Sequence, residues 1–155
     1  MSFSILSPDF KDGDTVPRRF SCDGEDMSPE IQWDGAPPAA KSLVLVVEDP
    51  DAPSGTFTHW IVYDMPSSLH KLSRGIGNGA IPGGVIKQGR TDFGRNGYGG
   101  PCPPKGHGPH RYNFILMALD IPALGLPDGA GKSDIERAMK GHILGTTKLM
   151  GIYRR

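Results

Sequence analysis

Two short segments of the chain concentrate side chains that can bind or transform a polar small molecule. The first is an Asp-Pro-Asp-Ala-Pro turn that leads into an apolar segment, and it contains Asp49, Asp51 and His59. The second is rich in glycine and proline and ends in His110 and Tyr112. Carboxylate, imidazole and phenol groups together supply hydrogen-bond donors, acceptors and proton-transfer groups. The two segments therefore predict a small polar pocket.

Each of these residues, taken singly, also has an ordinary structural explanation. A histidine between apolar residues such as Phe57 and Ile61 is often a satisfied core histidine, and Asp-Pro-Asp is a common turn. Their combination favours a functional role, because a strand end, an acidic turn and a Gly/Pro loop with His and Tyr supply what a polar pocket needs.

Two glycine-containing motifs suggest nucleotide chemistry that the sequence does not support. Residues 131–133 (Gly-Lys-Ser) resemble the end of a P-loop, but that motif requires a glycine where Leu126 stands. The glycine-rich run at residues 75–79 lacks the dinucleotide-binding spacing and the helix that follows it. We interpret the first motif as the start of a helix and the second as a loop.

A zinc site is also a weak hypothesis. Cys102, His107 and His110 are potential ligands, but only the two histidines have a close, ligand-like spacing. A structural zinc site needs four ligands and a catalytic site needs three. We therefore expect no metal and no cofactor.

The composition predicts a single, mostly β domain over residues 1–155. The 22 glycines and 15 prolines are about twice the usual share of these residues, while 37% of the chain is hydrophobic. This combination is typical of a folded domain with many loops. It excludes helical bundles and coiled coils, and the absence of a Gly-X-Y period excludes collagen.

Charge and cysteine content limit the expected partners and compartment. Seventeen basic and seventeen acidic residues give a formal net charge of zero, which argues against a nucleic-acid binder. The first residues lack a basic region followed by a long apolar stretch, so we expect neither a signal peptide nor a transmembrane segment. We therefore expect a cytoplasmic protein in which Cys22 and Cys102 are free thiols.

Hydrophobic periodicity predicts three main strands. Residues 43–47 form an unbroken apolar run, and residues 112–119 form a second β-rich segment. Residues 56–63 alternate in a way that would place four side chains on one face: Phe57, His59, Ile61 and Tyr63. Residues 75–109 contain twelve glycines and five prolines and predict a long functional loop.

Local signals predict one helix and one special peptide bond. Ser133 and Glu136 have capping-box spacing, and the apolar pattern that follows predicts a helix to about Leu144, ended by Gly145. The turn after residues 43–47 must end a buried strand within five residues and aim two carboxylates at one pocket. We therefore expect a cis bond between Ala52 and Pro53.

Three stretches of the sequence together resemble the phosphatidylethanolamine-binding proteins, which include the Raf kinase inhibitor proteins. They are DPDAP at 49–53, HWIVYDMP at 59–66 and GPCPPKGHGPHRYNF at 100–114, supported by SPEIQW at 28–33. The stretches occur in the family's order, and the resemblance is closest to its short bacterial and archaeal members. It implies a mostly β fold in which a large antiparallel sheet packs on a smaller sheet, with one or two short helices and a small anion-binding cavity.

The resemblance also implies which residues bind the ligand. The positions that match the family's motifs are Asp49, Asp51, His59, Pro103, Pro104, His110 and Tyr112. Two positions depart from the eukaryotic pattern. Cys102 stands where those members often have glycine, which changes the rim of the pocket, and the chain ends at Arg155 without the long C-terminal extension of the animal proteins. A kinase-inhibitor role that depends on this extension is therefore not expected.

These observations lead to three functional hypotheses. The first is a binding protein for phosphate, a phosphorylated small molecule or a phosphoethanolamine head group that regulates a kinase or protease partner. The second is a hydrolase in which His59 or His110 acts as base beside Asp49 or Asp51, or in which Cys102 is the nucleophile. The third is a purely structural or interaction role. The sequence leaves the oligomeric state open, a homodimer included.

The first hypothesis assigns a role to each group. Imidazole N–H groups, the Tyr112 hydroxyl and backbone N–H groups of the glycine-rich loop would donate to the anion. Asp49 would hold a histidine ring, and Asp51 would accept from an ammonium group. Because a neighbouring carboxylate favours the charged imidazole, we expect binding to tighten as the pH falls from about 7.5 to 6.

Overall fold

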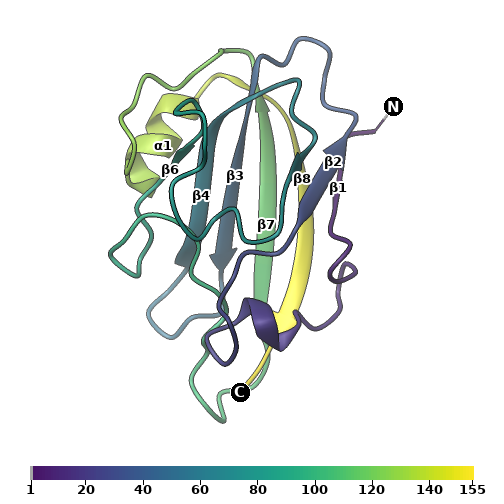
Figure 1. Ribbon diagram of the computed structural model, residues 1–155, viewed down its shortest axis with the longest axis vertical. Coiled ribbons are helices and arrows are strands. Elements are labelled where there is room, and N and C mark those ends of the chain that lie inside the picture. Colours follow the sequence, from purple (N-terminus) through teal and green to yellow (C-terminus); the bar gives the residue numbers. More distant parts are fainter. Residues whose placement is uncertain (1) are drawn as a thin grey trace.

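A computed structural model describes residues 2–155 and contains two antiparallel sheets and one α-helix (Figure 1). The large sheet has the strand order β6-β4-β3-β7-β8, and the small sheet has the order β1-β2-β5. This arrangement confirms the expected fold class. The elements are β1 (Ser4–Leu6), the 3-10 helix η1 (Arg18–Phe20), β2 (Ile31–Asp34), β3 (Ser42–Asp49), β4 (Phe57–Pro66), β5 (Lys71–Leu72), β6 (Lys87–Gln88), β7 (His110–Leu119), α1 (Lys132–Met139) and β8 (Ile143–Tyr153).

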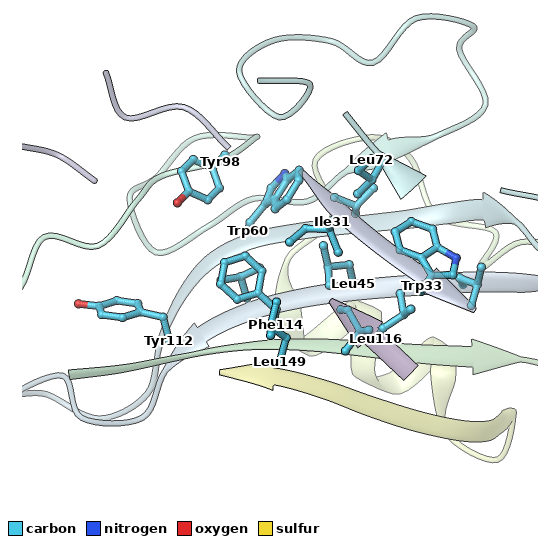
Figure 2. Packing of buried hydrophobic residues seen from close by; sticks show 14 of the residues in the cluster. Ile31, Trp33, Leu45, Trp60, Leu72, Tyr98, Tyr112, Phe114, Leu116 and Leu149 are labelled. Carbon is cyan, nitrogen blue, oxygen red and sulfur yellow. The ribbon is translucent and has the colours of Figure 1, made fainter. Parts of the chain in front are cut away.

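The main hydrophobic core lies between the two sheets. Figure 2 shows Ile31 and Trp33 of the small sheet packed towards Leu45, Phe114 and Leu116 of the large sheet, and all five side chains are buried. The alternating pattern of β7 accounts for this, because its even-numbered residues are buried while most of its odd-numbered ones are partly exposed. The core therefore covers one face of the large sheet.

Helix α1 covers part of the opposite face of the large sheet, beside β4 and β6 (Figure 1). Ile135 and Met139 are buried against the sheet. The predicted cap was wrong: Gly131 is the N-cap, and no side chain, that of Ser133 included, makes a cap hydrogen bond. The predicted end was also wrong, because Gly141 turns the chain with a φ of 83° and the following apolar residues belong to β8.

A β-bulge in β4 overturns the predicted alternation of that strand. Val47 pairs with Trp60 and Glu48 with Thr58, so His59 is an extra residue in the ladder. The extra residue separates the four side chains that were expected to share a face: Phe57 and His59 line a cavity, whereas Ile61 and Tyr63 pack beneath α1.

The turn between β3 and β4 forms without the expected cis bond. The Ala52–Pro53 bond is trans, as are the other described peptide bonds. Instead, the Asp51 N–H donates to Asp49 Oδ1 at 2.7 Å, and the Gly55 N–H donates to the Ala52 carbonyl at 3.1 Å. Gly55 has a φ of 112°, so a glycine and an aspartate side chain reverse the chain here.

The two cysteines form a disulfide, so the prediction of free thiols was wrong. Cys22 and Cys102 are 80 residues apart in sequence, but their Cα atoms lie 5.4 Å apart. The backbone brings them together, since the Cys22 N–H donates to the Pro101 carbonyl at 3.0 Å. The disulfide also removes the cysteine argument for a cytoplasmic location. In the described part of the chain, no helix has the length and apolar character to cross a membrane.

Candidate anion-binding site

The end of β3 and the start of β7 meet at one end of the large sheet (Figure 1). A cavity of about 200 Å³ lies beside them. Five of the seven expected residues line it, and Asp51 and Pro103 do not. The lining residues are Asp49, Ala52, Pro53, Phe57, His59, Phe93, Cys102, Pro104, His110 and Tyr112. Because β3 and β7 are antiparallel neighbours, the last residue of one strand meets the first residues of the other.

Asp49 and His110 form a buried pair at the base of the site. Asp49 Oδ2 accepts from His110 Nδ1 at 2.6 Å, and both side chains are less than 5% exposed. The other carboxylate oxygen of Asp49 accepts the Asp51 N–H. Both oxygens are therefore engaged, and the carboxylate fixes the proton of His110 on Nδ1.

His59 is held by the bulge and by the glycine-rich loop. Its Nδ1 lies 2.8 Å from the Gly99 carbonyl oxygen, which can only accept, so Nδ1 carries the proton. The ring packs edge-on against Phe93 and Tyr112, with ring centroids 5.2 Å apart in each case. Burial lowers the pKa of His59. The ring is therefore neutral near pH 7, and its Nε2 is an acceptor.

The Tyr112 hydroxyl is the free donor of the site. It is buried and makes no hydrogen bond to any residue between 2 and 155. Figure 2 shows the hydroxyl directed away from the hydrophobic cluster that contains the rest of the side chain. Burial raises the pKa of Tyr112, and the nearby Asp49 carboxylate raises it further, so the phenol keeps its proton.

Asp51 faces away from the cavity. Its carboxylate accepts from Arg111 Nε at 2.9 Å and from Nη2 at 2.8 Å, and Arg111 lowers the pKa of Asp51 to about 2. The carboxylate borders a separate, more open cavity of about 380 Å³ that His107, His110 and Arg111 also line. In this arrangement Asp51 is not available to a cation bound beside His59.

Two backbone N–H groups of the glycine-rich loop are engaged outside the cavity. The Gly99 N–H donates to the His59 carbonyl at 3.0 Å, and the Gly100 N–H donates to Asp26 Oδ1 at 2.7 Å. Three of the next four residues are prolines and have no N–H. The carbonyl of Pro103 faces the C-terminus instead and accepts from Arg155 Nη1 at 3.4 Å.

The aromatic wall of the cavity was missed from the sequence. Phe57 and Phe93 meet edge to face with ring centroids 4.8 Å apart. Phe57 could have been found, because it precedes His59 in the strand pattern. Phe93 lies in the irregular loop, and its place depends on Gly99, where a Cβ would come 2.3 Å from the Phe93 ring.

The structure shows no cluster of metal ligands in its described part. Residues 2–155 contain no group of three or more His, Cys, Asp or Glu side chains arranged to hold an ion.

Comparison with known proteins identifies the family. The family model of the phosphatidylethanolamine-binding proteins matches residues 6–154. The chain belongs to this family. A UPF0098 protein of Aquifex aeolicus is 50% identical over 151 residues, which cover 97% of this chain and 88% of that protein. The UPF0098 protein YbhB of Escherichia coli is 38% identical, with 96% and 98% covered.

Solved structures of family members have the same fold over the full length of the chain. The putative phosphatidylethanolamine-binding protein homolog CT736 from Chlamydia trachomatis superposes with a TM-score of 0.89 at 38% identity, covering 99% of this chain and 98% of its own. E. coli YbcL, described as a member of the mammalian PEBP family, superposes with a TM-score of 0.93 at 29% identity, covering 100% and 99%. The family match therefore extends over both sheets.

Proposed function

We propose that the protein binds a small oxyanion, such as the phosphate of a phosphorylated ligand, in the cavity between Asp49, His59, His110 and Tyr112. The observation that carries this proposal is the Tyr112 hydroxyl, a buried donor without a partner beside two imidazole rings. A buried polar group without a partner is costly, and a ligand oxygen in the cavity would satisfy it. Membership of the phosphatidylethanolamine-binding family supports a phosphate-bearing ligand.

Binding of an anion in this cavity takes up a proton. In the neutral state His59 donates to Gly99 and His110 donates to Asp49, so neither ring has a second N–H for the ligand. A bound oxyanion favours a charged imidazole beside it over a neutral one, because opposite charges attract. Burial lowers the pKa of His59 and opposes the charged form of that ring in the free protein. We therefore expect the affinity to increase as the pH falls.

The form of the hydrolase alternative that uses a protein nucleophile does not fit this arrangement. No serine or threonine lines the cavity, and the Cys102 sulfur is bonded to Cys22. A thiolate must be free to attack a substrate. We therefore propose binding in preference to covalent hydrolysis.

The test is a titration with sulfate, whose charge does not change near neutral pH. Backbone NMR shifts of the wild-type protein should identify residues of the cavity, with tighter binding at pH 6 than at pH 7.5. His59→Ala and His110→Asn should weaken binding about tenfold or more, and Asn at 110 can still donate to Asp49. His142→Ala is the control, because His142 pairs with Asp120 on the surface. Equal binding by all four proteins would contradict the proposal.

Three ligands distinguish the possible sources of the phosphate. Inorganic phosphate, free phosphoethanolamine and vesicles that contain phosphatidylethanolamine present the same oxyanion in different settings. Affinity for the two soluble ligands without vesicle binding would indicate a free metabolite. Affinity for vesicles that depends on His110 would indicate a lipid head group.

A further inference from the structure

The anion cavity has two chemically different ends, and the His59 ring contacts both. The polar end contains the Asp49 carboxylate and the Tyr112 hydroxyl. The aromatic end contains Phe57 and Phe93, whose ring centroids are 4.8 Å apart. The His59 ring centroid lies 5.2 Å from that of Tyr112 and 5.0 Å from that of Phe57. An oxyanion that accepts from the Tyr112 hydroxyl therefore leaves the aromatic end to the rest of the ligand.

We propose that the part of the ligand beyond the oxyanion is apolar and uncharged, so that the site prefers the phosphate monoester of a short apolar alcohol to phosphoethanolamine. This inference rests on the proposed function, since it names the class of ligand for the same cavity. The volume of about 200 Å³ is smaller than the roughly 300–1,000 Å³ of pockets that hold drug-sized ligands. The cavity therefore selects the first few atoms attached to the phosphate.

Several acceptors that a ligand ammonium group would need are already engaged. An ammonium group has N–H donors only and requires acceptors around it. Both carboxylate oxygens of Asp49 accept hydrogen bonds from the protein, and the residue is only 3% exposed. The Ala52 carbonyl accepts the Gly55 N–H at 3.1 Å, and the Pro104 carbonyl accepts the His107 N–H at 3.1 Å. These lining residues therefore offer an ammonium group little that is free.

The His59 ring brings one acceptor, Nε2, to the aromatic end, because its Nδ1 donates to the Gly99 carbonyl. One neutral nitrogen cannot satisfy the three N–H groups of an ammonium. The other N–H groups would lie against Phe57, Phe93 and Pro53, whose side chains are apolar. Burying a charged donor without a partner is costly, whereas a methyl group in the same place needs no partner.

Aromatic rings can also attract a cation, but the protein itself uses the Phe93 ring in this way. The Arg95 Cζ atom lies over this ring, 5.1 Å from its centroid. Two carboxylates near Phe93 are engaged: Asp26 lies 4.0 Å from Arg95, and Asp92 accepts a backbone N–H of β4 at 2.7 Å. Phe57 meets Phe93 edge to face. An apolar substituent can cover both rings without displacing any of these contacts.

Covering the aromatic end should increase the affinity in steps. Phe93 is 37% exposed and Phe57 is partly exposed, so both rings have surface that a ligand can remove from water. Each methylene group buried there should increase the affinity about fourfold. Methyl, ethyl and propyl phosphate should therefore bind with increasing affinity.

Three ligands of the same size test the preference in the wild-type protein. Propyl phosphate, 2-hydroxyethyl phosphate and phosphoethanolamine differ only in their terminal methyl, hydroxyl or ammonium group. At pH 7.5 their phosphates are mostly dianions, and backbone NMR shifts measure the affinities. Propyl phosphate should bind about tenfold more tightly than phosphoethanolamine. The hydroxyethyl ester should lie between them, and its charge equals that of the propyl ester, so it separates polarity from charge. Phosphoethanolamine that binds as tightly as propyl phosphate, or more tightly, overturns the inference.

The substitution Phe57→Ala tests the aromatic end directly. It should weaken propyl phosphate binding about fivefold and leave inorganic phosphate binding unchanged, because only the ester covers the ring. Leu144→Ala is the matched control, since Leu144 is an exposed apolar side chain of β8 beyond the end of β7 opposite His110. An unchanged preference for propyl phosphate in Phe57→Ala overturns the inference. Failure of the wild-type protein to bind inorganic phosphate and all the esters overturns the proposed function, whereas phosphate binding with another order of esters overturns the inference alone.

Discussion

Tyr112 and Tyr98 show how one side chain can be committed either to stability or to binding. Both are almost fully buried in the main core. The Tyr98 hydroxyl donates to the Phe20 carbonyl at 2.7 Å and so fixes the glycine-rich loop to η1. The Tyr112 hydroxyl makes no such bond. This difference is the reason that we propose the Tyr112 hydroxyl as a donor to the ligand.

Removing these hydroxyls should have opposite effects on the free energy of unfolding. Tyr112→Phe removes a buried donor that has no partner, so the unfolding free energy should stay constant or rise by up to about 1 kcal/mol, while sulfate affinity falls. Tyr98→Phe leaves the Phe20 carbonyl without its donor. This substitution should lower the free energy of unfolding by about 1 kcal/mol. Urea unfolding of the two variants measures both values. A loss of more than 1 kcal/mol in Tyr112→Phe would show that this hydroxyl has a partner in the free protein.

At the scale of elements, the bulge in β4 accounts for the position of the site. One extra residue turns His59 towards Tyr112 and leaves Ile61 to pack beneath α1. A strict alternation would have placed both side chains on the same face. Bulges are common next to functional sites because they re-aim a side chain without ending the strand.

At the start of helix α1, Ser133 matches a capping-box pattern but does not cap the helix. Ser133 is exposed within the helix and caps nothing, whereas Ile135 is fully buried against the large sheet. Ser133→Ala should therefore raise the free energy of unfolding by no more than about 0.5 kcal/mol, through helix propensity alone. Ile135→Ala should lower it by about 2–5 kcal/mol through the cavity that it creates. Urea unfolding tests both, and a clear loss in Ser133→Ala would restore the capping role.

At the scale of the whole molecule, the sequence predicted the features that depend on local pattern. The three main strands follow from apolar runs and alternation, and the cavity lies where the two segments that end or begin strands meet. The bulge at His59 could not be predicted, because it depends on how β4 pairs with β3. The engagement of Asp51 by Arg111 and the place of Phe93 depend on contacts between distant loops. Periodicity contains no information on such contacts.

The disulfide is a covalent contact between distant segments, and its effect on the free energy of unfolding follows from the length of the loop that it closes. Joining two cysteines 80 residues apart restricts the unfolded chain and stabilises the folded state by about 4 kcal/mol. The core between the sheets contains neither cysteine, and two hydrogen bonds also join the same segments: Cys22 N–H to Pro101, and Gly100 N–H to Asp26. The reduced protein should therefore remain folded at 25 °C.

Reduction should lower the melting temperature by roughly 10 °C, as expected for a loss of about 4 kcal/mol in a domain of this size. Circular dichroism with and without a thiol reductant measures the shift. The double variant Cys22→Ser, Cys102→Ser is the matched control, because it should melt near the temperature of the reduced wild type and ignore the reductant. Sulfate binding should survive reduction, since His59, His110 and Tyr112 are held by the large sheet and by Asp49. A melting temperature that is the same for oxidised, reduced and double-variant protein would show that the bond contributes nothing to stability in solution.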